Sequence, residues 1–204
     1  MSPDIIMSQL STLGILSRDG ISYSFDHRAN GYAKGEGFGV VVLKRVRDAV
    51  KDNDTIRAVI RATAINQDGR TPGLSQPSKQ AQTENILQAY RNFDLDLAKT
   101  QYFEAHGTGT AVGDPLEAEG IYNAFKRTSE NPLYVGSVKA NVGHLESGAG
   151  IVSLIKSVLM LEKGVMPPNA FFEKVNPRIP ADSWGLQVCI AADGTEYSFW
   201  TSLF

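Results

Sequence analysis

Short apolar runs alternate with helical patterns along this chain, and this alternation limits its fold more than any other feature of the sequence. Each run is rich in β-branched residues and too short for a helix, which is typical of buried strands. Strands that alternate with helices indicate an α/β layered fold with a largely parallel sheet. The strands predicted from these runs cover residues 38–43, 56–65, 102–104 and 133–138.

Helical patterns and two long loops fill the intervals between the predicted strands. Ser78 and Asp114 have side chains that can cap helices, and Pro115 fits the first turn of the helix that Asp114 caps. The last helix is apolar nearly all round, which is typical of a buried helix. Long loops inside a compact domain are usually functional. The predicted helices cover residues 2–14, 46–51, 78–90, 114–125 and 147–161, and the predicted loops cover 17–37 and 66–77.

The composition excludes several classes of protein. The formal net charge of −2 offers no electrostatic attraction to nucleic acid or to an anionic membrane. No apolar run reaches the roughly 18 residues that a membrane span needs, and the first residues lack the pattern of a signal peptide. A single cysteine, Cys189, allows neither an internal disulfide framework nor a cysteine-based zinc site. We therefore expect one cytoplasmic domain that binds neither nucleic acid nor membrane.

Two of the three histidines, His106 and His144, lie in similar surroundings. Each follows a short predicted strand and adjoins a glycine, Gly107 or Gly143, which lets a substrate approach the ring closely. Ligand sites of open α/β sheets lie at the carboxyl ends of strands, where both histidine loops fall. Two imidazoles there could donate hydrogen bonds to a developing oxyanion, or move a proton near neutral pH.

The pattern alone leaves a plainer alternative open, in which these are two unrelated loop histidines. Zinc binding by the pair is disfavoured, because a third ligand at suitable spacing is missing. Residues 107–110 (GTGT) also lack the spacing and the Gly-Lys-Ser/Thr ending of a phosphate-binding P-loop.

Three motifs in the sequence occur in the order that is typical of one enzyme family. Residues 104–117 (EAHGTGTAVGDPLE) and residues 136–146 (GSVKANVGHLE) resemble the first and the second histidine motif of the β-ketoacyl synthases. Residues 26–37 look like the segment that precedes both motifs in the ketosynthase domains of type I polyketide synthases. The resemblance covers residues 2–188, and His27 falls where the family usually has a small residue, so we interpret it as a surface residue without a role.

The resemblance implies a thiolase-like fold and a decarboxylative Claisen condensation. A cysteine takes the growing acyl chain from an acyl carrier protein. Malonyl on the carrier's phosphopantetheine then loses carbon dioxide, and the resulting enolate attacks the acyl thioester. The implied partners are the acyl carrier protein and the acyl and malonyl thioesters, the complete domain is expected to be a homodimer, and no cofactor is expected to bind directly.

The resemblance also implies roles for individual residues. His106 and His144 would donate hydrogen bonds to the malonyl thioester oxygen and stabilise the enolate. Lys139 would order the His106 region by pairing with Glu117 or Asp114, and we favour a structural ion pair, which serves catalysis indirectly, as the interpretation of this lysine. The residues implied to contact the phosphopantetheine arm are Thr108 and Thr110.

The chain also departs from the family pattern. The family's nucleophile lies in a Thr-Ala-Cys-Ser-Ser type elbow upstream of residue 26, and no such stretch occurs here. Cys189 is no substitute, because it follows both histidines and lacks a glycine-sharpened turn from strand to helix. The family's closing Gly-Phe-Gly-Gly-Thr-Asn motif is absent as well. We therefore interpret residues 1–188 as a partial ketosynthase domain and residues 189–204 as a divergent C-terminal tail.

These departures predict an incomplete thiolase-like fold, without the N-terminal half that carries the elbow and without the closing segment. We expect the chain alone to be inactive in condensation; a non-catalytic partner subunit and an inert truncated gene product are the alternatives. His106 and His144 should face one cavity, with Lys139 beside them. The helix over 148–161 should be partly uncovered, and the chain should be marginally stable in isolation.

Overall fold

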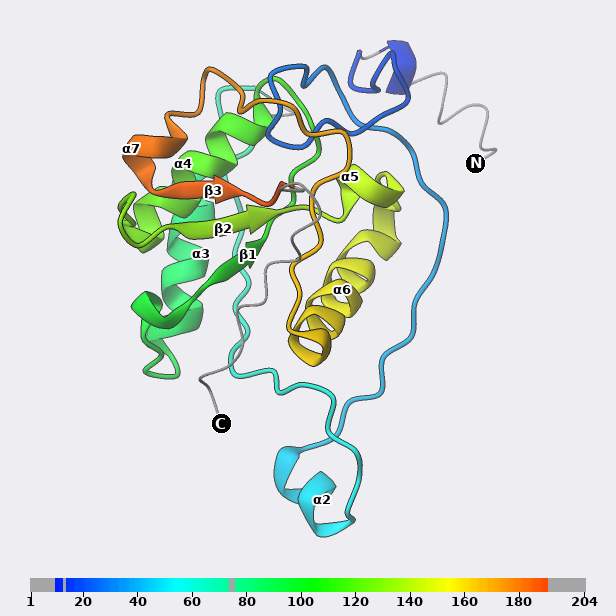
Figure 1. Ribbon diagram of the computed structural model, residues 1–204, viewed down its shortest axis with the longest axis vertical. Helices are drawn as coiled ribbons and strands as arrows, with labels where there is room; N and C mark the ends of the chain where they lie inside the picture. The colour runs from blue at the N-terminus through cyan, green and yellow to red at the C-terminus, as the bar shows by residue number, and fades with distance from the viewer. Residues whose placement is uncertain (1–9, 13, 74–75, 191–204) are drawn as a thin grey trace.

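Local sequence signals place most of the elements in the computed structural model, which describes residues 10–12, 14–73 and 76–190. The Ser78 hydroxyl accepts a hydrogen bond from the backbone N–H of Ala81 and caps α3, as expected. Helix α4 begins at Gly113, so Asp114 lies in its first turn and is not its cap. Elements α7 and β3 were not predicted, and the helix expected over 2–14 falls largely outside the described residues. The elements (Figure 1) are α2 (Val46–Lys51), α3 (Lys79–Arg91), η1 (Leu97–Lys99), β1 (Tyr102–Glu104), α4 (Gly113–Phe125), β2 (Leu133–Gly136), α5 (Lys139–Val142), η2 (Glu146–Gly148), α6 (Ala149–Lys163), α7 (Ala181–Trp184) and β3 (Leu186–Val188).

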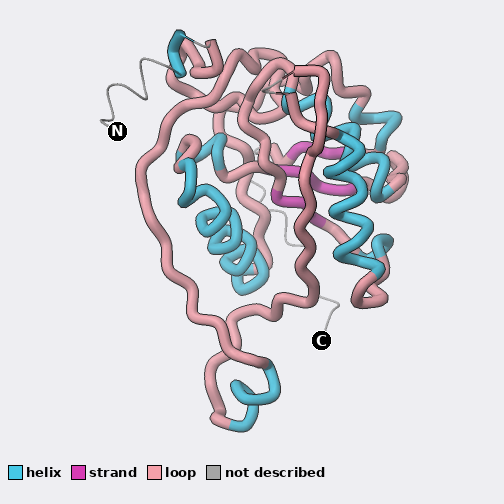
Figure 2. The backbone as a smooth tube through the Cα atoms, turned by 180° about the vertical axis from the view of Figure 1, so that it is seen from behind, coloured by secondary structure: helices cyan, strands magenta, loops and turns pink. Residues whose placement is uncertain are grey.

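The sheet is parallel, with the strands in the order β1–β2–β3. Parallel neighbours must be joined by a crossover, and α4 provides the one between β1 and β2, while α6 and α7 lie between β2 and β3. Helices α3 and α4 pack together on one face of the sheet, and α6 lies on the other side (Figures 1 and 2). The largely parallel α/β fold expected from the sequence is confirmed.

Side chains of β2 alternate between the two faces of the sheet, as the period of a strand requires. Leu133 and Val135 join the main core together with apolar side chains of α4, and Leu133 is 0% exposed. Tyr134 points the other way and packs against Met160 of α6 and the buried Cys189. Both faces of β2 are therefore covered by apolar side chains.

The loop expected over residues 17–37 forms, and contacts far along the chain hold it in place. Asp26 is buried, and its carboxylate accepts hydrogen bonds from the backbone N–H groups of Glu173 (2.7 Å) and Lys174 (3.1 Å). The guanidinium of Arg28 donates to the same carboxylate at 2.8 Å. A single buried carboxylate thus ties two loops that are 147 residues apart in sequence.

Residues 38–65, called the arm below, leave the rest of the molecule as two extended runs joined by α2 (Figure 1). Phe38 and Val42 are 92% and 94% exposed. The strands expected over 38–43 and 56–65 are therefore wrong: no strand of the described residues pairs with either run. A β-branched run becomes a buried strand only where a neighbouring strand takes up its backbone hydrogen bonds.

The apolar helix expected over 147–161 forms as α6, but it is not buried as its composition suggested. Leu159 and Leu161 are exposed, which confirms the expectation that this helix is partly uncovered. The arm passes beside α6 at Gly39, where a Cβ atom would lie 2.4 Å from Cγ2 of Ile151. The buried residues of α6 are Ala149, Lys156 and Met160.

Candidate active site

His106 and His144 lie together beyond the carboxyl ends of β1 and β2. His106 follows β1 by two residues, and His144 follows the short helix α5 that begins just after β2. Their ring centroids are 5.4 Å apart, and the ring planes are nearly perpendicular at 86°. Because parallel strands deliver their carboxyl ends to one edge of a sheet, two loops separated in sequence meet there. The expected proximity of the two imidazoles is confirmed.

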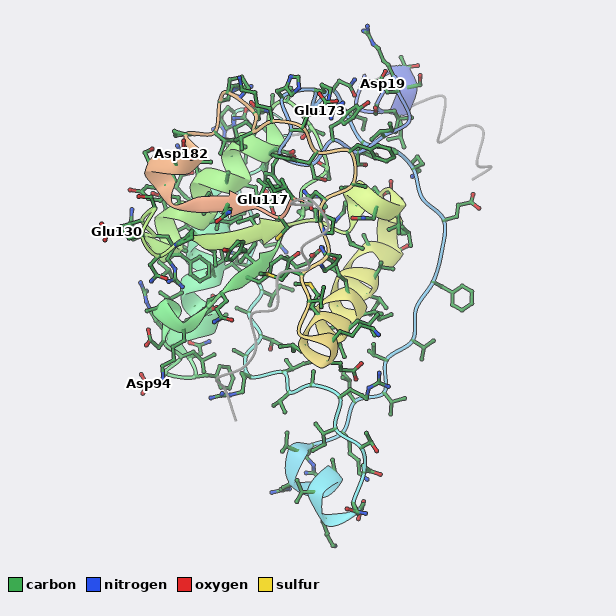
Figure 3. The ribbon with its side chains drawn as sticks, in the orientation of Figure 1. Asp19, Asp94, Glu117, Glu130, Glu173 and Asp182 are labelled. Carbon is green, nitrogen blue, oxygen red and sulfur yellow. The ribbon has the colours of Figure 1, made fainter. Side chains whose placement is uncertain are left out.

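Glu117 of α4 holds the loop that carries His106. Its carboxylate accepts hydrogen bonds from the backbone N–H groups of His106 (2.6 Å) and Gly107 (2.8 Å). Gly107 has a φ of +43°, and a Cβ atom there would lie 2.6 Å from Cβ of Ser137. Only glycine fits this close approach of the loop to Ser137, whose hydroxyl donates to the His106 carbonyl at 3.1 Å. Figure 3 shows Glu117 in the interior, while other labelled acids such as Asp94 lie at the rim.

Asp114 of α4 holds the second part of the same loop, at Gly109 and Thr110. Its buried carboxylate accepts hydrogen bonds from the backbone N–H groups of Phe25 (2.7 Å), Gly109 (3.1 Å) and Thr110 (3.3 Å). Burial raises the pKa of Asp114 to about 7, and the three backbone hydrogen bonds oppose this shift. The loop after β1 is thus anchored by two acids of α4, which explains why both acids stand in the first histidine motif.

Lys139 lies beside this loop but does not pair with an acid of it. The residue is 2% exposed, and burial lowers the pKa of its ammonium group, while the charges of Glu117 and Glu104 raise it. Among the described residues, no carboxylate lies within 4.0 Å of its nitrogen. The expected location of Lys139 near acids is confirmed, but the expected direct pairing is wrong, because Glu117 uses its oxygens on backbone N–H groups.

The loop that carries His144 is held by a segment far upstream. The backbone of His144 donates to the Ala33 carbonyl (2.7 Å) and accepts from the Gly35 N–H (3.0 Å). The ring of Tyr32 lies 5.0 Å from the His144 ring, centroid to centroid. Sequence reasoning missed Tyr32, although its position in the motif before both histidine loops was a signal. Lys34 adds an ion pair with Glu146 at 2.5 Å.

A backbone hydrogen bond fixes the tautomer of His144. The N–H of Glu146 donates to Nδ1 of His144 at 2.9 Å. A nitrogen that accepts a hydrogen bond carries no proton in the neutral ring, so the proton of neutral His144 is on Nε2. Neutral His144 therefore has its N–H donor at Nε2.

Both imidazoles are neutral at pH 7. Burial, the charge of Lys139 and the neighbouring His144 together lower the pKa of His106 to about 4, although His106 keeps a solvent-exposed side. Burial also lowers the pKa of His144, while the charge of Glu146 raises it. Two neutral N–H donors at this spacing can stabilise negative charge that develops on a ligand oxygen.

The two threonines of the first motif interact with each other at the start of α4. Their hydroxyls are 3.3 Å apart, and the Thr110 hydroxyl accepts a hydrogen bond from the backbone N–H of Gly113 at 3.1 Å. Thr108 is buried. The hydroxyl of Thr110 thus takes part in beginning the helix, and the predicted contact of both threonines with a phosphopantetheine arm stays a prediction.

Other candidate groups lie away from the histidine pair. His27 is partly exposed and lies 3.4 Å from a carboxylate oxygen of Glu173. Cys189 is buried beside Met160, and burial raises the pKa of its thiol to about 11. A cavity of about 380 Å³ lies at the amino ends of the strands, beside Arg127. In the described part of the chain no group of three potential metal ligands occurs, and no helix there has the length and apolarity to cross a membrane.

Sequence comparisons find relatives that match most of this chain. The profile described as "Beta-ketoacyl synthase, C-terminal domain" matches residues 57–173, and the one described as "Beta-ketoacyl synthase, N-terminal domain" matches residues 1–49. The highly reducing polyketide synthase NEC1 of Pyricularia oryzae is 57% identical over 189 residues, and the compactin diketide synthase mlcB of Penicillium citrinum is 50% identical over 192 residues. These matches cover 92% and 94% of this chain but 7% of each relative.

Solved ketosynthases have the same fold. The oxazolomycin ketosynthase domain of Streptomyces albus superposes with a TM-score of 0.89 at 37% identity. The ketosynthase from module 6 of the bacillaene synthase of Bacillus subtilis superposes with a TM-score of 0.85 at 35% identity. The superpositions cover 93% and 92% of this chain and 34% of each solved chain. The expected thiolase-like fold is thereby confirmed for about a third of such a domain.

Proposed function

The chain belongs to the β-ketoacyl synthase family, as part of a polyketide synthase ketosynthase domain, and on that premise we propose that it supplies the two-histidine part of a condensing site. The substrates are acyl and malonyl thioesters, the latter carried on the phosphopantetheine of an acyl carrier protein. The observation that carries this proposal is the 5.4 Å separation of the His106 and His144 rings at the open edge of the sheet.

The chemistry needs hydrogen-bond donors that are neutral before reaction. When the malonyl thioester loses carbon dioxide, the electron pair of the breaking carbon–carbon bond passes into an enolate, whose negative charge gathers on the thioester oxygen. Donors already in place at that oxygen lower the barrier, because they need no reorganisation during the step. Nε2–H of His144 meets this requirement, and His106 stands within reach of the same oxygen.

Lys139 helps to keep the two imidazoles neutral without touching the substrate. Burial is the main cause of the lowered pKa values of His106 and His144, and the positive charge of Lys139 lowers both further. A cationic imidazole would hold the malonyl carboxylate as an ion pair and oppose its loss, so a nearby buried cation favours decarboxylation indirectly. Thr108 and Thr110, at the start of α4, are the side chains that we propose contact the phosphopantetheine arm.

The condensation itself needs a thiolate to hold the acyl group. The enolate carbon attacks the carbonyl of that acyl thioester, a carbon–carbon bond forms, and the carbon–sulfur bond breaks with return of the thiolate. Cys189 does not fit this role, because it is buried on the far side of β2 from the main core and its pKa is about 11. We therefore expect no condensation by this chain alone. In a complete domain, which we expect to be a homodimer, the thiolate belongs to another part of the fold.

The proposal is tested by adding a soluble malonyl-pantetheine thioester to the full chain labelled with ¹⁵N-histidine. The imidazole signals of His106 and His144 should shift together, while that of His27 should not. His106→Ala and His144→Ala should each abolish the shift of the remaining ring, and His27→Ala is the matched control. Equal shifts at all three histidines, or none, would overturn the assignment. A 3-oxoacyl product with acylated Cys189 would overturn the expected inactivity.

A further inference from the structure

We propose that Glu104, neutralised by Lys156, is a positioning residue that sets the distance between the two histidine loops. Glu104 is the last residue of β1 and precedes His106 by two positions. Its Oε1 accepts a hydrogen bond from the backbone N–H of Val138 at 2.7 Å. Val138 directly precedes α5, which leads to His144. One side chain therefore joins the base of the first loop to the base of the second. This inference rests on the proposed function of the histidine pair.

Lys156 of α6 makes this arrangement possible. Its ammonium lies 2.8 Å from Oε2 of Glu104 and 2.8 Å from the Tyr102 hydroxyl, which itself donates to the same carboxylate oxygen. The side chains of Lys156 and Glu104 are 9% and 8% exposed. A buried carboxylate without a partner would lose much hydration, so the ammonium of Lys156 compensates the charge of Glu104 at this position.

An ion pair that only attaches α6 to the sheet would explain the contact between Lys156 and Oε2 of Glu104. It would not explain the hydrogen bond that Oε1 accepts. Oε1 of Glu104 bonds neither to α6 nor to its own strand; it bonds to the backbone that leads to Lys139. The Ser137 hydroxyl makes a second link, to the His106 carbonyl. The two links run between the same two loops in opposite directions, so together they restrict both sliding and rotation of one loop on the other.

The sequence contains a signal for this pair. Lys156 lies in the middle of α6 among apolar side chains, whereas the other cation of this helix, Lys163, is its last residue. A lysine in such a helix is buried only when it is paired. Its partner could not be found from the sequence, because Glu104 lies 52 positions away on a strand whose neighbours were not known.

Two double variants of the full chain separate positioning from charge. Glu104→Gln with Lys156→Met removes both charges but keeps a carbonyl oxygen that can accept from Val138. Glu104→Ala with Lys156→Met removes both charges and the acceptor. Both variants are free of an unpaired buried charge, so they differ in the loop-to-loop hydrogen bond. A third variant, Arg57→Met with Glu162→Gln, removes the exposed ion pair at the end of α6 and serves as the control.

The readouts are the nuclear Overhauser effect between the rings of His106 and His144, and the pKa of His106. The glutamine variant should keep the ring-to-ring effect and a His106 pKa of about 4. The alanine variant should lose the effect, and the pKa of His106 should rise towards 6.5 as the ring leaves its buried surroundings and Lys139. The control variant should match the unmodified chain in both respects.

Equal ring contacts in the two double variants would overturn the inference, since the acceptor would then have no positional role. If the alanine variant does not fold, amide exchange at Val138 decides the question in the glutamine variant. Protection equal to that of the unmodified chain supports the inference, and lost protection with unchanged ring contact overturns it. A chain that keeps the ring contact but does not respond to the malonyl thioester would refute the proposed function alone, because no thioester enters this experiment.

Discussion

The strand β2 and the first run of the arm have similar sequences but opposite surroundings. Residues 133–136 (LYVG) lie between two parallel neighbours, with β1 and β3 taking up the backbone hydrogen bonds on either side. Residues 38–43 (FGVVVL) are at least as rich in β-branched residues, yet Phe38 and Val42 are almost fully exposed. The difference teaches that a β-branched run specifies an extended backbone, whereas burial depends on which neighbours are available.

Amide hydrogen exchange should give the largest contrast between these two regions. Residues 38–43 and 56–65 have no ladder hydrogen bonds in the described structure, so their amides should exchange at nearly the rate of an unfolded peptide. The amides of β2 should exchange at least about a thousandfold more slowly, because their hydrogen bonds break only when much of the sheet opens. Exchange measured by mass spectrometry on the full chain decides this. Comparable protection in the two regions would mean that the arm has found a partner, such as a second copy of the chain.

Truncation of one apolar side chain in each region should give the second-largest contrast, measured as the change in the free energy of unfolding. Leu133→Ala should lower the free energy of unfolding by about 2–5 kcal/mol, because it leaves a cavity under α4. Val42→Ala removes a side chain that is 94% exposed and should change that free energy by no more than about 0.5 kcal/mol. Urea denaturation of both variants is the measurement. A large loss from the Val42 variant would show that the arm is packed in solution.

The pH dependence of stability should come from the part of the molecule that contains the sheet, and it should involve His106. Its pKa is about 4 in the folded chain against 6.5 for an ordinary histidine. As the pH falls from 6.5 to 4, the unfolded chain binds a proton that the folded chain does not, so the folded state loses stability in this window. His106→Gln should remove this contribution, while His27→Gln should leave it unchanged. A His106 titration midpoint near 6.5 by NMR would contradict the shift.

The ion pair between the arm and α6 should have the smallest effect. Arg57 donates to both carboxylate oxygens of Glu162, with one contact at 2.6 Å, but both side chains are open to solvent. Water and salt screen such pairs strongly. We expect Arg57→Ala to leave the urea midpoint unchanged within experimental error, and added salt to make no difference to that result. A clear loss of stability would show that the arm is fixed against α6.

Local patterns predicted much of the fold, because caps and periodicity depend on nearby residues. Helix α2 has the predicted bounds, and Ser78 caps α3 as expected. The runs 38–43 and 56–65 were misinterpreted, since strand pairing depends on residues distant in sequence. Strand β3 was missed, because its three residues are too few for an alternating pattern to be recognised.

The candidate site divides in the same way. The closeness of His106 and His144 was predictable, since two loops that follow parallel strands meet at one edge of a sheet. The contacts that hold these loops were not, because Tyr32 lies more than a hundred positions before His144, and Lys156 lies 52 positions after Glu104. The two histidines that we propose to act were thus predictable from the sequence, whereas most of the contacts that position them were not.

The hydrogen bonds of the buried Asp26 carboxylate affect the order in which the molecule assembles during synthesis. Its backbone partners Glu173 and Lys174 are synthesised 147 and 148 residues after it, which corresponds to a delay of roughly 7 to 30 seconds at usual rates of translation. Residues 32–35, which contact His144, lack the anchor at Asp26 during that delay, whereas β1 can already pair with β2. The nascent chain can therefore pair the strands that carry the two histidine loops first, and it anchors Asp26 only after Glu173 and Lys174 have been made.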